Sequence, residues 1–263
     1  MKMSFDHDYH IHSILSACCS DERQTAERIL KYAEENNLKK ICITDHLWDS
    51  AVSGASEWYK PQNIEHISNI LPLPKSDICE FKFGCECELD KNLTLSLAKE
   101  NFDKFDFIVI PTTHMHMKGF TANEEDYDFP ERFAKHWTSR FAAVLRMDIP
   151  FEKIGIAHIT CNCLAPKPHF LEVLQMISDE DMYKNFSKAA ELGAGIELNY
   201  EDMKLLDDNA DIILRPYKIA KECGCKFYFG TDAHKPDVFD NAKNVFGKAV
   251  NLLSLTEDDK FIF

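Results

Sequence analysis

Residues 8–13 read Asp-Tyr-His-Ile-His-Ser, and this short stretch does most to decide the fold. It overlaps the first predicted β-strand, over residues 5–11. His10 and His12 are two residues apart, so on a strand both imidazoles point to one face and can bind the same ion. Imidazole is a common ligand of zinc and other transition metals. The sequence therefore predicts a metal site at the end of the first strand.

Similar candidate ligands occur at the ends of later strands. Apolar runs predict strands over residues 5–11, 40–44, 80–86, 105–110, 154–159, 194–199 and 226–231. The motifs at their ends are Thr44-Asp45-His46, Gly84-Cys85-Glu86, Thr113-His114, Ala157-His158 and Thr231-Asp232-Ala233-His234. Together with the first pair, they place metal-binding side chains after six of these seven strands.

Amphipathic helices alternate with these strands. Ala26, Ile29, Leu30 and Ala33 fall at i, i+3, i+4 and i+7, and residues 132–147 and 211–223 give two more helices. Such alternation indicates parallel strands joined by right-handed crossovers. An open sheet would spread six strand ends along a line, whereas a barrel gathers them at one mouth. We therefore predict an α/β fold, a seven-stranded (β/α) barrel of TIM-barrel type, as a single domain over residues 1–263.

Composition narrows the classes of function. The chain has 263 residues, is 45% hydrophobic and carries a formal net charge of −14. This acidic balance argues against binding to long nucleic acids or to a membrane surface, which favour basic proteins. The start of the chain has no apolar core of the signal-peptide type, so we expect a cytoplasmic protein. Its 10 cysteines are then expected to be reduced thiols.

Taken in order, the motifs between residues 5 and 235 resemble those of the PHP superfamily, named for polymerase and histidinol phosphatase. The length is similar to that of the stand-alone, histidinol-phosphatase-like members. The resemblance implies a distorted seven-stranded (β/α) barrel. It also implies a centre of two or three divalent metal ions (zinc, manganese or iron) that hydrolyses phosphate esters.

The resemblance also implies a set of ligands. His10, His12, Glu86 and Asp232 would hold the first ion; Glu86, His114 and His158 the second, with Glu86 as the bridge; and His46 and His234 the third. The family often adds a histidine or aspartate to the third site, a few residues after His-x-His. Residues 16–22 here read Ser-Ala-Cys-Cys-Ser-Asp-Glu, so we expect Asp21 there, with Cys18 and Glu22 as alternatives. Glu86, Asp232 and His234 are the predicted catalytic residues.

Other residues are expected to support the centre or bind substrate. Asp45 should orient His46, since metal-bound imidazoles usually donate their second N–H to a carboxylate or carbonyl. Glu197 and Asn199 end the sixth strand and could line the mouth. Arg215 is the preferred phosphate contact because its guanidinium fork suits phosphate, and His116 and Lys118 are further candidates. Long loops over residues 47–79 and 111–130 offer aromatic side chains to an organic group.

The leading hypothesis is hydrolysis of a phosphate monoester of a small metabolite, such as L-histidinol phosphate. One alternative is a phosphodiesterase or exonuclease acting on small nucleotides. Another is a non-catalytic, metal-stabilised binding module. The sequence makes no prediction of the oligomeric state.

Overall fold

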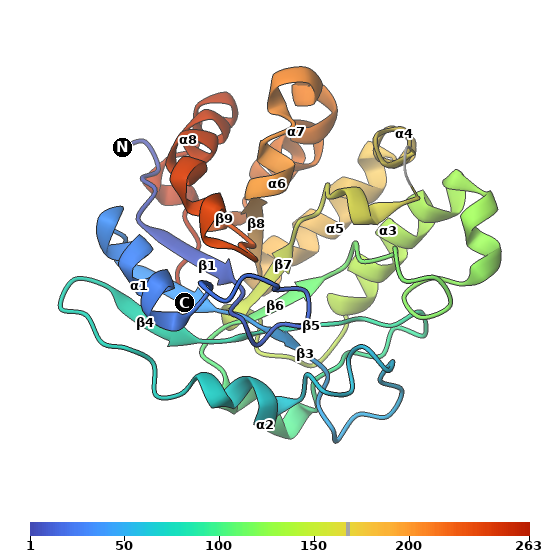
Figure 1. The fold of residues 1–263 in the computed structure, drawn as a ribbon. Coiled ribbons are helices and arrows are strands. Elements are labelled where there is room, and N and C mark those ends of the chain that lie inside the picture. The colour runs from blue at the N-terminus through green and yellow to red at the C-terminus, as the bar shows by residue number, and fades with distance from the viewer. Residues whose placement is uncertain (167–168) are drawn as a thin grey trace.

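The computed structural model describes residues 1–166 and 169–263, with the strands at the centre and the helices around them (Figure 1). The strands are β1 (His7–Ile11), β2 (Lys40–Ile43), β3 (His46–Leu47), β4 (Glu80–Phe83), β5 (Cys85–Cys87), β6 (Ile108–Pro111), β7 (Ile154–Ala157), β8 (Gly195–Asn199) and β9 (Lys226–Gly230). Every pairing between these strands is parallel. The seven predicted strands are all present.

Two predicted strands are each interrupted, which explains the two additional short strands. The run at 40–44 forms β2, and the chain pairs again as β3 just beyond that run. The run at 80–86 forms β4 and then β5 on either side of Gly84. A Cβ at Gly84 would lie 2.4 Å from the carbonyl oxygen of Phe107, so this close approach of two strands requires glycine. The breaks divide the strands into the sheets β1-β2-β4 and β3-β5-β6-β7-β8-β9.

The first and last strands lie side by side and close the ring. The Asp232 N–H donates to the carbonyl of His10 at 2.7 Å, and the His12 N–H donates to the carbonyl of Ala233 at 3.2 Å. The predicted (β/α) barrel is therefore confirmed. Its carboxyl strand ends, where the candidate ligands lie, share one mouth.

Aromatic side chains fill the interior of the barrel. A buried cluster joins Tyr9, Cys42, Phe107, Val109, Ala157, Tyr228 and Phe261. Phe263 stacks on Phe107 with ring centroids 4.6 Å apart. This packing gives the mouth a dense apolar base, which restricts water below the candidate site.

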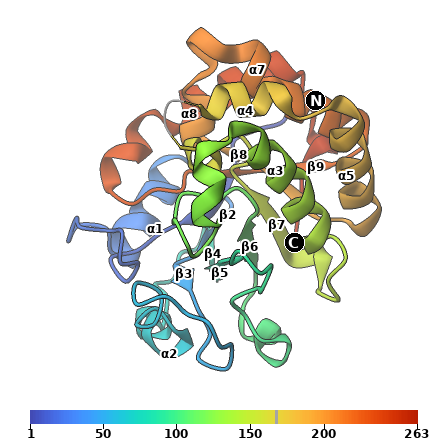
Figure 2. The same ribbon diagram turned by 90° about the vertical axis from the view of Figure 1, so that its right-hand side faces the viewer.

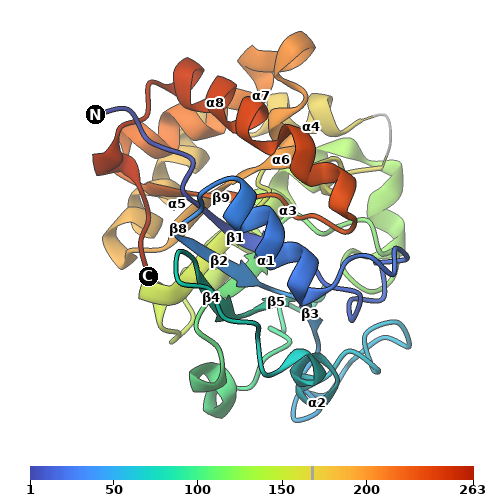
Figure 3. The same ribbon diagram turned by 60° about the vertical axis from the view of Figure 1, so that its left-hand side comes forward.

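The α-helices form the outer layer. They are α1 (Ala26–Glu35), α2 (Ile64–Ile67), α3 (Pro130–Val144), α4 (Phe170–Met176), α5 (Asp179–Leu192), α6 (Tyr200–Met203), α7 (Leu206–Glu222) and α8 (Ala242–Leu253). Short 3-10 helices cover Ser68–Ile70, Lys99–Lys104, Glu124–Asp128, Phe151–Lys153, Asn162–Leu164, Pro236–Asn241 and Glu257–Asp259. Figure 2 shows α3, α4, α5 and α7 packed together on one side. In Figure 3, α1 lies against the β1–β2 region.

The predicted helices correspond to α1, α3 and α7. Thr25 begins α1 by accepting a hydrogen bond from the Arg28 N–H, and the apolar side of the helix buries Ile29, Leu30 and Ala33. No helix in the part of the chain described here is both long and apolar enough to cross a membrane.

Candidate metal centre

Potential ligands converge at the mouth of the barrel in three groups. They are His10 with His12 and Glu86; Glu86 with His114 and His158; and His12 with Cys18, His46 and His234. Within each group, one ligand atom per residue lies within 4.8 Å of all the others. The first two groups share Glu86, so its carboxylate occupies the middle of the assembly.

The first group has distances suited to a metal ion. His10 Nε2 lies 3.1 Å from His12 Nε2, and Asp232 Oδ1 lies 3.4 and 3.0 Å from these two nitrogens. Glu86 Oε2 lies 3.7 and 3.4 Å from the same nitrogens. Tetrahedral zinc with bonds of about 2.0–2.1 Å keeps neighbouring ligand atoms about 3.3 Å apart. These four side chains therefore fit around one ion with small adjustments.

Hydrogen bonds set the tautomers of five histidines. The Nδ1–H groups donate from His10 to Glu197, from His12 to Ser16, from His114 to Glu88, from His158 to Thr113, and from His234 to the carbonyl of Asp232. Ser16 accepts because its own hydroxyl donates to Asp45, and Thr113 accepts because its hydroxyl donates to the His158 carbonyl. Each ring then keeps a lone pair on Nε2 for a metal ion.

Glu86 makes close approaches with both carboxylate oxygens. Oε1 lies 3.1 Å from His158 Nε2 and 4.0 Å from His114 Nε2, while Oε2 lies 2.7 Å from His46 Nδ1. Yet Glu86 Oε2 and His46 Nδ1 are buried and have no hydrogen-bond partner. Buried polar atoms seldom go unpaired, and a cation bound to both atoms would satisfy them.

The two carboxylates of the centre are held in their charged form. Burial alone would raise the pKa of Glu86, but the imidazoles of His46 and His10 keep it well below its usual value. Burial likewise opposes the charge on Asp232, and His10 and His12 hold its pKa well below the ordinary range. Both side chains are thus anionic ligands over the neutral pH range.

Two residues of the centre have strained backbones. His158 and Asp232 have positive φ values of 29° and 51°, which non-glycine residues rarely adopt. Hydrogen bonds compensate: the His158 N–H donates to Glu197 at 2.6 Å, and the Asp232 N–H donates to His10. Strain of this kind is characteristic of functional sites.

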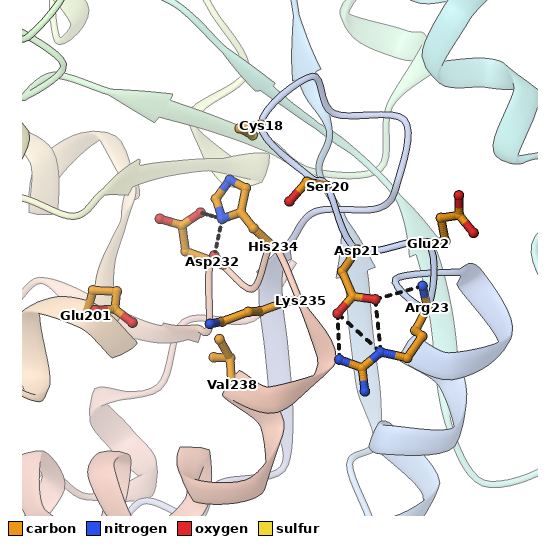
Figure 4. A pocket seen from close by; sticks show the side chains of 10 residues that line it. All are labelled: Cys18, Ser20, Asp21, Glu22, Arg23, Glu201, Asp232, His234, Lys235 and Val238. Atoms are coloured by element: carbon orange, nitrogen blue, oxygen red, sulfur yellow. Dashed lines mark hydrogen bonds and ion pairs between the residues drawn. The ribbon is translucent and has the colours of Figure 1, made fainter.

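The structure does not place Asp21 in the third group. Its carboxylate accepts hydrogen bonds from the Arg23 guanidinium at 2.6–3.2 Å and from the Arg23 N–H (Figure 4). This correction has a local cause, since an arginine two residues along the chain reaches the carboxylate in bidentate geometry. Glu22 is also outside the group, whereas Cys18, the other alternative, is part of it.

The substrate contacts expected from sequence need a similar correction. Arg215 lies on α7 and donates to the carbonyls of Leu174 and Ile177 at the end of α4, away from the ligands. The Lys118 ammonium lies 5.6 Å from the Tyr127 ring centroid. His116, in contrast, lines a cavity beside the ligands.

That cavity has a volume of about 400 Å³ and is more apolar than polar. The described residues that line it are Cys18, His46, Trp58, Tyr59, Glu86, His114, His116, Met117, Cys163, Asp232 and His234, and none of these is a lysine or arginine. A second, more open cavity of about 840 Å³ includes Arg23 and Lys235 (Figure 4). Cys18, Asp232 and His234 line both cavities.

Three supporting residues were not predicted in these roles. Glu88 accepts from His114 and from the Tyr59 hydroxyl, at 3.0 and 2.8 Å. Glu88 follows Glu86 by two residues, a spacing that puts both side chains on the same face of an extended chain. This spacing could have identified Glu88 from the sequence. Ser16 links Asp45 to His12 through hydrogen bonds. Asp45 therefore supports the ring of His12, whereas the sequence led us to expect that it would orient His46.

Arg140 is the third, and it carries no sequence signal of its own. Its buried guanidinium on α3 donates to the carbonyls of Leu89, Asp90, Thr112, His114 and Thr121. It thereby connects the loops that carry Glu88 and His114.

Sequence comparison identifies the class of protein. The model of the PHP domain matches residues 8–201, so the chain belongs to the PHP domain family. Asp232 and His234 lie beyond the matched residues. No curated protein matches the chain.

Among solved structures, the fold is similar to that of histidinol phosphate phosphatase from Lactococcus lactis subsp. lactis, solved with zinc, L-histidinol and phosphate. The TM-score is 0.62 at 16% identity, covering 98% of this chain and 99% of that one. A probable 2-pyrone-4,6-dicarboxylic acid hydrolase from Acinetobacter baumannii has a TM-score of 0.44 at 13% identity, with 96% of each chain covered.

Proposed function

We propose that this chain is a metal-dependent phosphatase that hydrolyses a phosphate monoester of a small metabolite. The observation that carries this proposal is the pair of ligand groups that share the Glu86 carboxylate. A shared carboxylate suits two metal ions held a few ångströms apart, which is the arrangement used by many phosphoesterases. The fold similarity to a histidinol phosphate phosphatase supports the same reaction class.

In this proposal the chain holds two or three divalent ions, with zinc, manganese and iron as the candidates. His10, His12, Glu86 and Asp232 would hold the first, and Glu86, His114 and His158 the second. Bound ions supply Lewis-acid polarisation of the phosphoryl group and a water acidic enough to attack at neutral pH. The chain's own carboxylates, Glu86 and Asp232, fix the spacing of the ligand groups.

The cavity beside the ligands favours a small organic ester. Among residues 1–166 and 169–263 its lining includes no lysine or arginine, so bound metal ions would supply positive charge for the phosphate there. Trp58, Tyr59 and Met117 form an apolar wall that can pack on the organic group. His234 would complete the centre from the side of the open cavity.

A phosphodiesterase that acts on small nucleotides is the second candidate. Trp58 is 36% exposed and could stack on a base. The cavity of about 400 Å³ would admit a mononucleotide more readily than a polymer.

A substrate panel on the metal-loaded protein tests the proposal. It should contain p-nitrophenyl phosphate, bis-p-nitrophenyl phosphate and L-histidinol phosphate, with metal content measured by elemental analysis. We expect at least two ions per chain and release of phosphate from monoesters.

Glu86→Gln should nearly abolish turnover, whereas the exposed Glu80→Gln control should not. Preferential cleavage of the diester would favour the second candidate. Folded, metal-loaded protein inert to every ester would support a binding module.

A further inference from the structure

Cys18 lies among three histidines at the mouth of the barrel. Its Sγ and one nitrogen each of His12, His46 and His234 all lie within 4.8 Å of one another. We propose that Cys18 binds the third metal ion as a thiolate, which makes this site selective for soft transition metals. The inference rests on the proposed metal centre but concerns a residue that no family motif supplies.

The loop that carries Cys18 is fixed in position. The Ser16 hydroxyl donates to Asp45 at 2.7 Å and accepts from the His46 N–H at 3.2 Å. The Ala17 N–H donates to Gln62 at 2.8 Å, and the Cys19 N–H donates to the carbonyl of Ser16 at 2.8 Å. These contacts flank Cys18 on both sides, so its thiol has a defined place beside the histidines.

Two of the histidines around Cys18, His46 and His234, have nitrogens available for an ion. His234 donates its Nδ1–H to the Asp232 carbonyl at 2.8 Å, which leaves Nε2 as an acceptor. The side chain of His46 is 9% exposed, and its buried Nδ1 lies 2.7 Å from Glu86 Oε2, with neither atom making a hydrogen bond to the described residues. Its ring and those of His12 and His234 have centroids within 6.1 Å of one another. This cluster of rings, with one unpartnered nitrogen, points to a cation.

The carboxylate expected from sequence at this site, that of Asp21, is already paired with an arginine. Asp21 is bound by Arg23, whose guanidinium also contacts Asp237 at 3.1 Å. To reach the histidines, Asp21 would have to give up a bidentate ion pair. Cys18 needs no such exchange, and it lies on the walls of both cavities.

Sulfur changes which ions the site prefers. Thiolate ligands favour zinc and other soft ions, whereas carboxylate and water ligands suit magnesium and manganese. The Glu86-bridged groups offer nitrogen and oxygen alone, so one centre would contain two kinds of site. Binding requires the thiol to release its proton to solvent, after which sulfur donates an electron pair to the ion.

Cobalt(II) reports directly on a thiolate ligand. The purified protein would be stripped of metal, loaded with cobalt(II) to saturation, and scanned for the sulfur-to-cobalt charge-transfer band in the near ultraviolet. We expect the band in the wild type and its loss in Cys18→Ser, with the visible cobalt bands of the other sites retained. Cys163→Ser is the matched control, because Cys163 lines the same cavity but lies outside the ligand group. Asp21→Asn should also keep the band.

Cys18→Asp provides a second measurement that does not depend on colour. In competition between zinc and manganese, this variant should take up more manganese at the third site than the wild type does. An unchanged ratio, or a charge-transfer band that survives Cys18→Ser, would overturn the proposal.

Phosphate release from the same cobalt-loaded samples separates this inference from the proposed function. Phosphate release without a charge-transfer band in the wild type would overturn the proposal that Cys18 is a ligand, but not the proposed phosphatase activity. A band lost in Cys18→Ser without any turnover would support the ligand and count against the phosphatase. Failure to bind cobalt at all would overturn both.

Discussion

Glu197 Oε1 lies 2.7 Å from Nδ1 of His10, and both side chains are completely buried. The other oxygen of Glu197 accepts from the His158 N–H at 2.6 Å. One carboxylate therefore fixes a ligand at the end of β1 and another at the end of β7. It also supports the unusual backbone conformation of His158.

Glu197→Gln should weaken metal binding although Glu197 is not itself a ligand. However the amide is turned, its NH₂ group faces a donor, either His10 Nδ1–H or His158 N–H. Loss of such supporting hydrogen bonds typically costs about 10–100-fold in metal affinity. Competition against a chromophoric chelator would measure it. Glu201→Gln, at an exposed position nearby, is the control, and equal affinity in both variants would count against the role of Glu197.

Gly230→Ala should disrupt the same contact from the neighbouring strand. An added Cβ would lie 1.8 Å from Glu197 Oε1 and 2.7 Å from the Cβ of His10. We expect a loss of about 3 kcal/mol in the free energy of unfolding, together with weaker metal binding. Urea denaturation of metal-free protein would show it.

Gly247→Ala is the control for Gly230→Ala, because it adds the same methyl group at a position with open space. A Cβ at this position on α8 meets nothing within 4 Å. Replacing a helical glycine there should raise stability by up to about 1 kcal/mol. If both alanine variants were equally stable, the close packing around Gly230 would be in doubt.

Trp58→Ala should raise KM more than it lowers kcat. Trp58 lines the apolar wall of the cavity and meets His46 edge-on at 5.3 Å between ring centroids. Losing a stacking partner for the organic group should raise KM about 10-fold, equivalent to about 1.4 kcal/mol. Steady-state kinetics on an aromatic and an aliphatic phosphate ester would test this. Trp58→Phe should restore most of the affinity, and an unchanged KM in Trp58→Ala would place the substrate elsewhere.

Asp6 should contribute to stability in a pH-dependent way. Burial opposes its charge, but hydrogen bonds with His7 and Lys260 lower the pKa of Asp6 from 3.8 to about 2. Because the folded pKa is depressed, the contribution is complete above pH 4 and is lost as the pH falls towards 2. Asp6 is partly exposed, so Asp6→Asn should cost about 1 kcal/mol at pH 6.

The measurement is the difference in unfolding free energy between wild type and Asp6→Asn across that pH range. The two curves should converge as the solution becomes more acidic. Asp77→Asn, at an exposed position, should follow the wild type throughout. A difference that stayed constant from pH 6 to pH 3 would rule out the ionic origin.

The features predicted well from sequence depend on short-range periodicity and on ligand type. Strand β1, which carries His10 and ends just before His12, and the apolar side of α1 follow from residue spacing alone. The barrel was predicted because the candidate ligands follow the strands, and a closed barrel brings the carboxyl ends of its strands together at one mouth. The break at Gly84 did not follow, since its cause is the approach of Phe107 from a distant part of the chain.

The errors concern long side chains with several possible partners. Arg215 follows the sixth strand in sequence, but its guanidinium reaches the last carbonyls of α4. Asp21 stands close to the His-x-His motif, but Arg23 competes for it. Sequence gives the charge of such residues, whereas the choice between partners depends on which helix face and which loop end lie within reach.

The closure of β9 against β1 has a consequence for how the protein is made. His10 and His12 are synthesised long before Asp232, whose carboxylate lies 3.4 and 3.0 Å from their Nε2 atoms. A nascent chain therefore exposes an incomplete chelating pair while most of the barrel is still being translated. Full metal affinity can arise only when the last strand docks, so metal loading would coincide with the final step of folding.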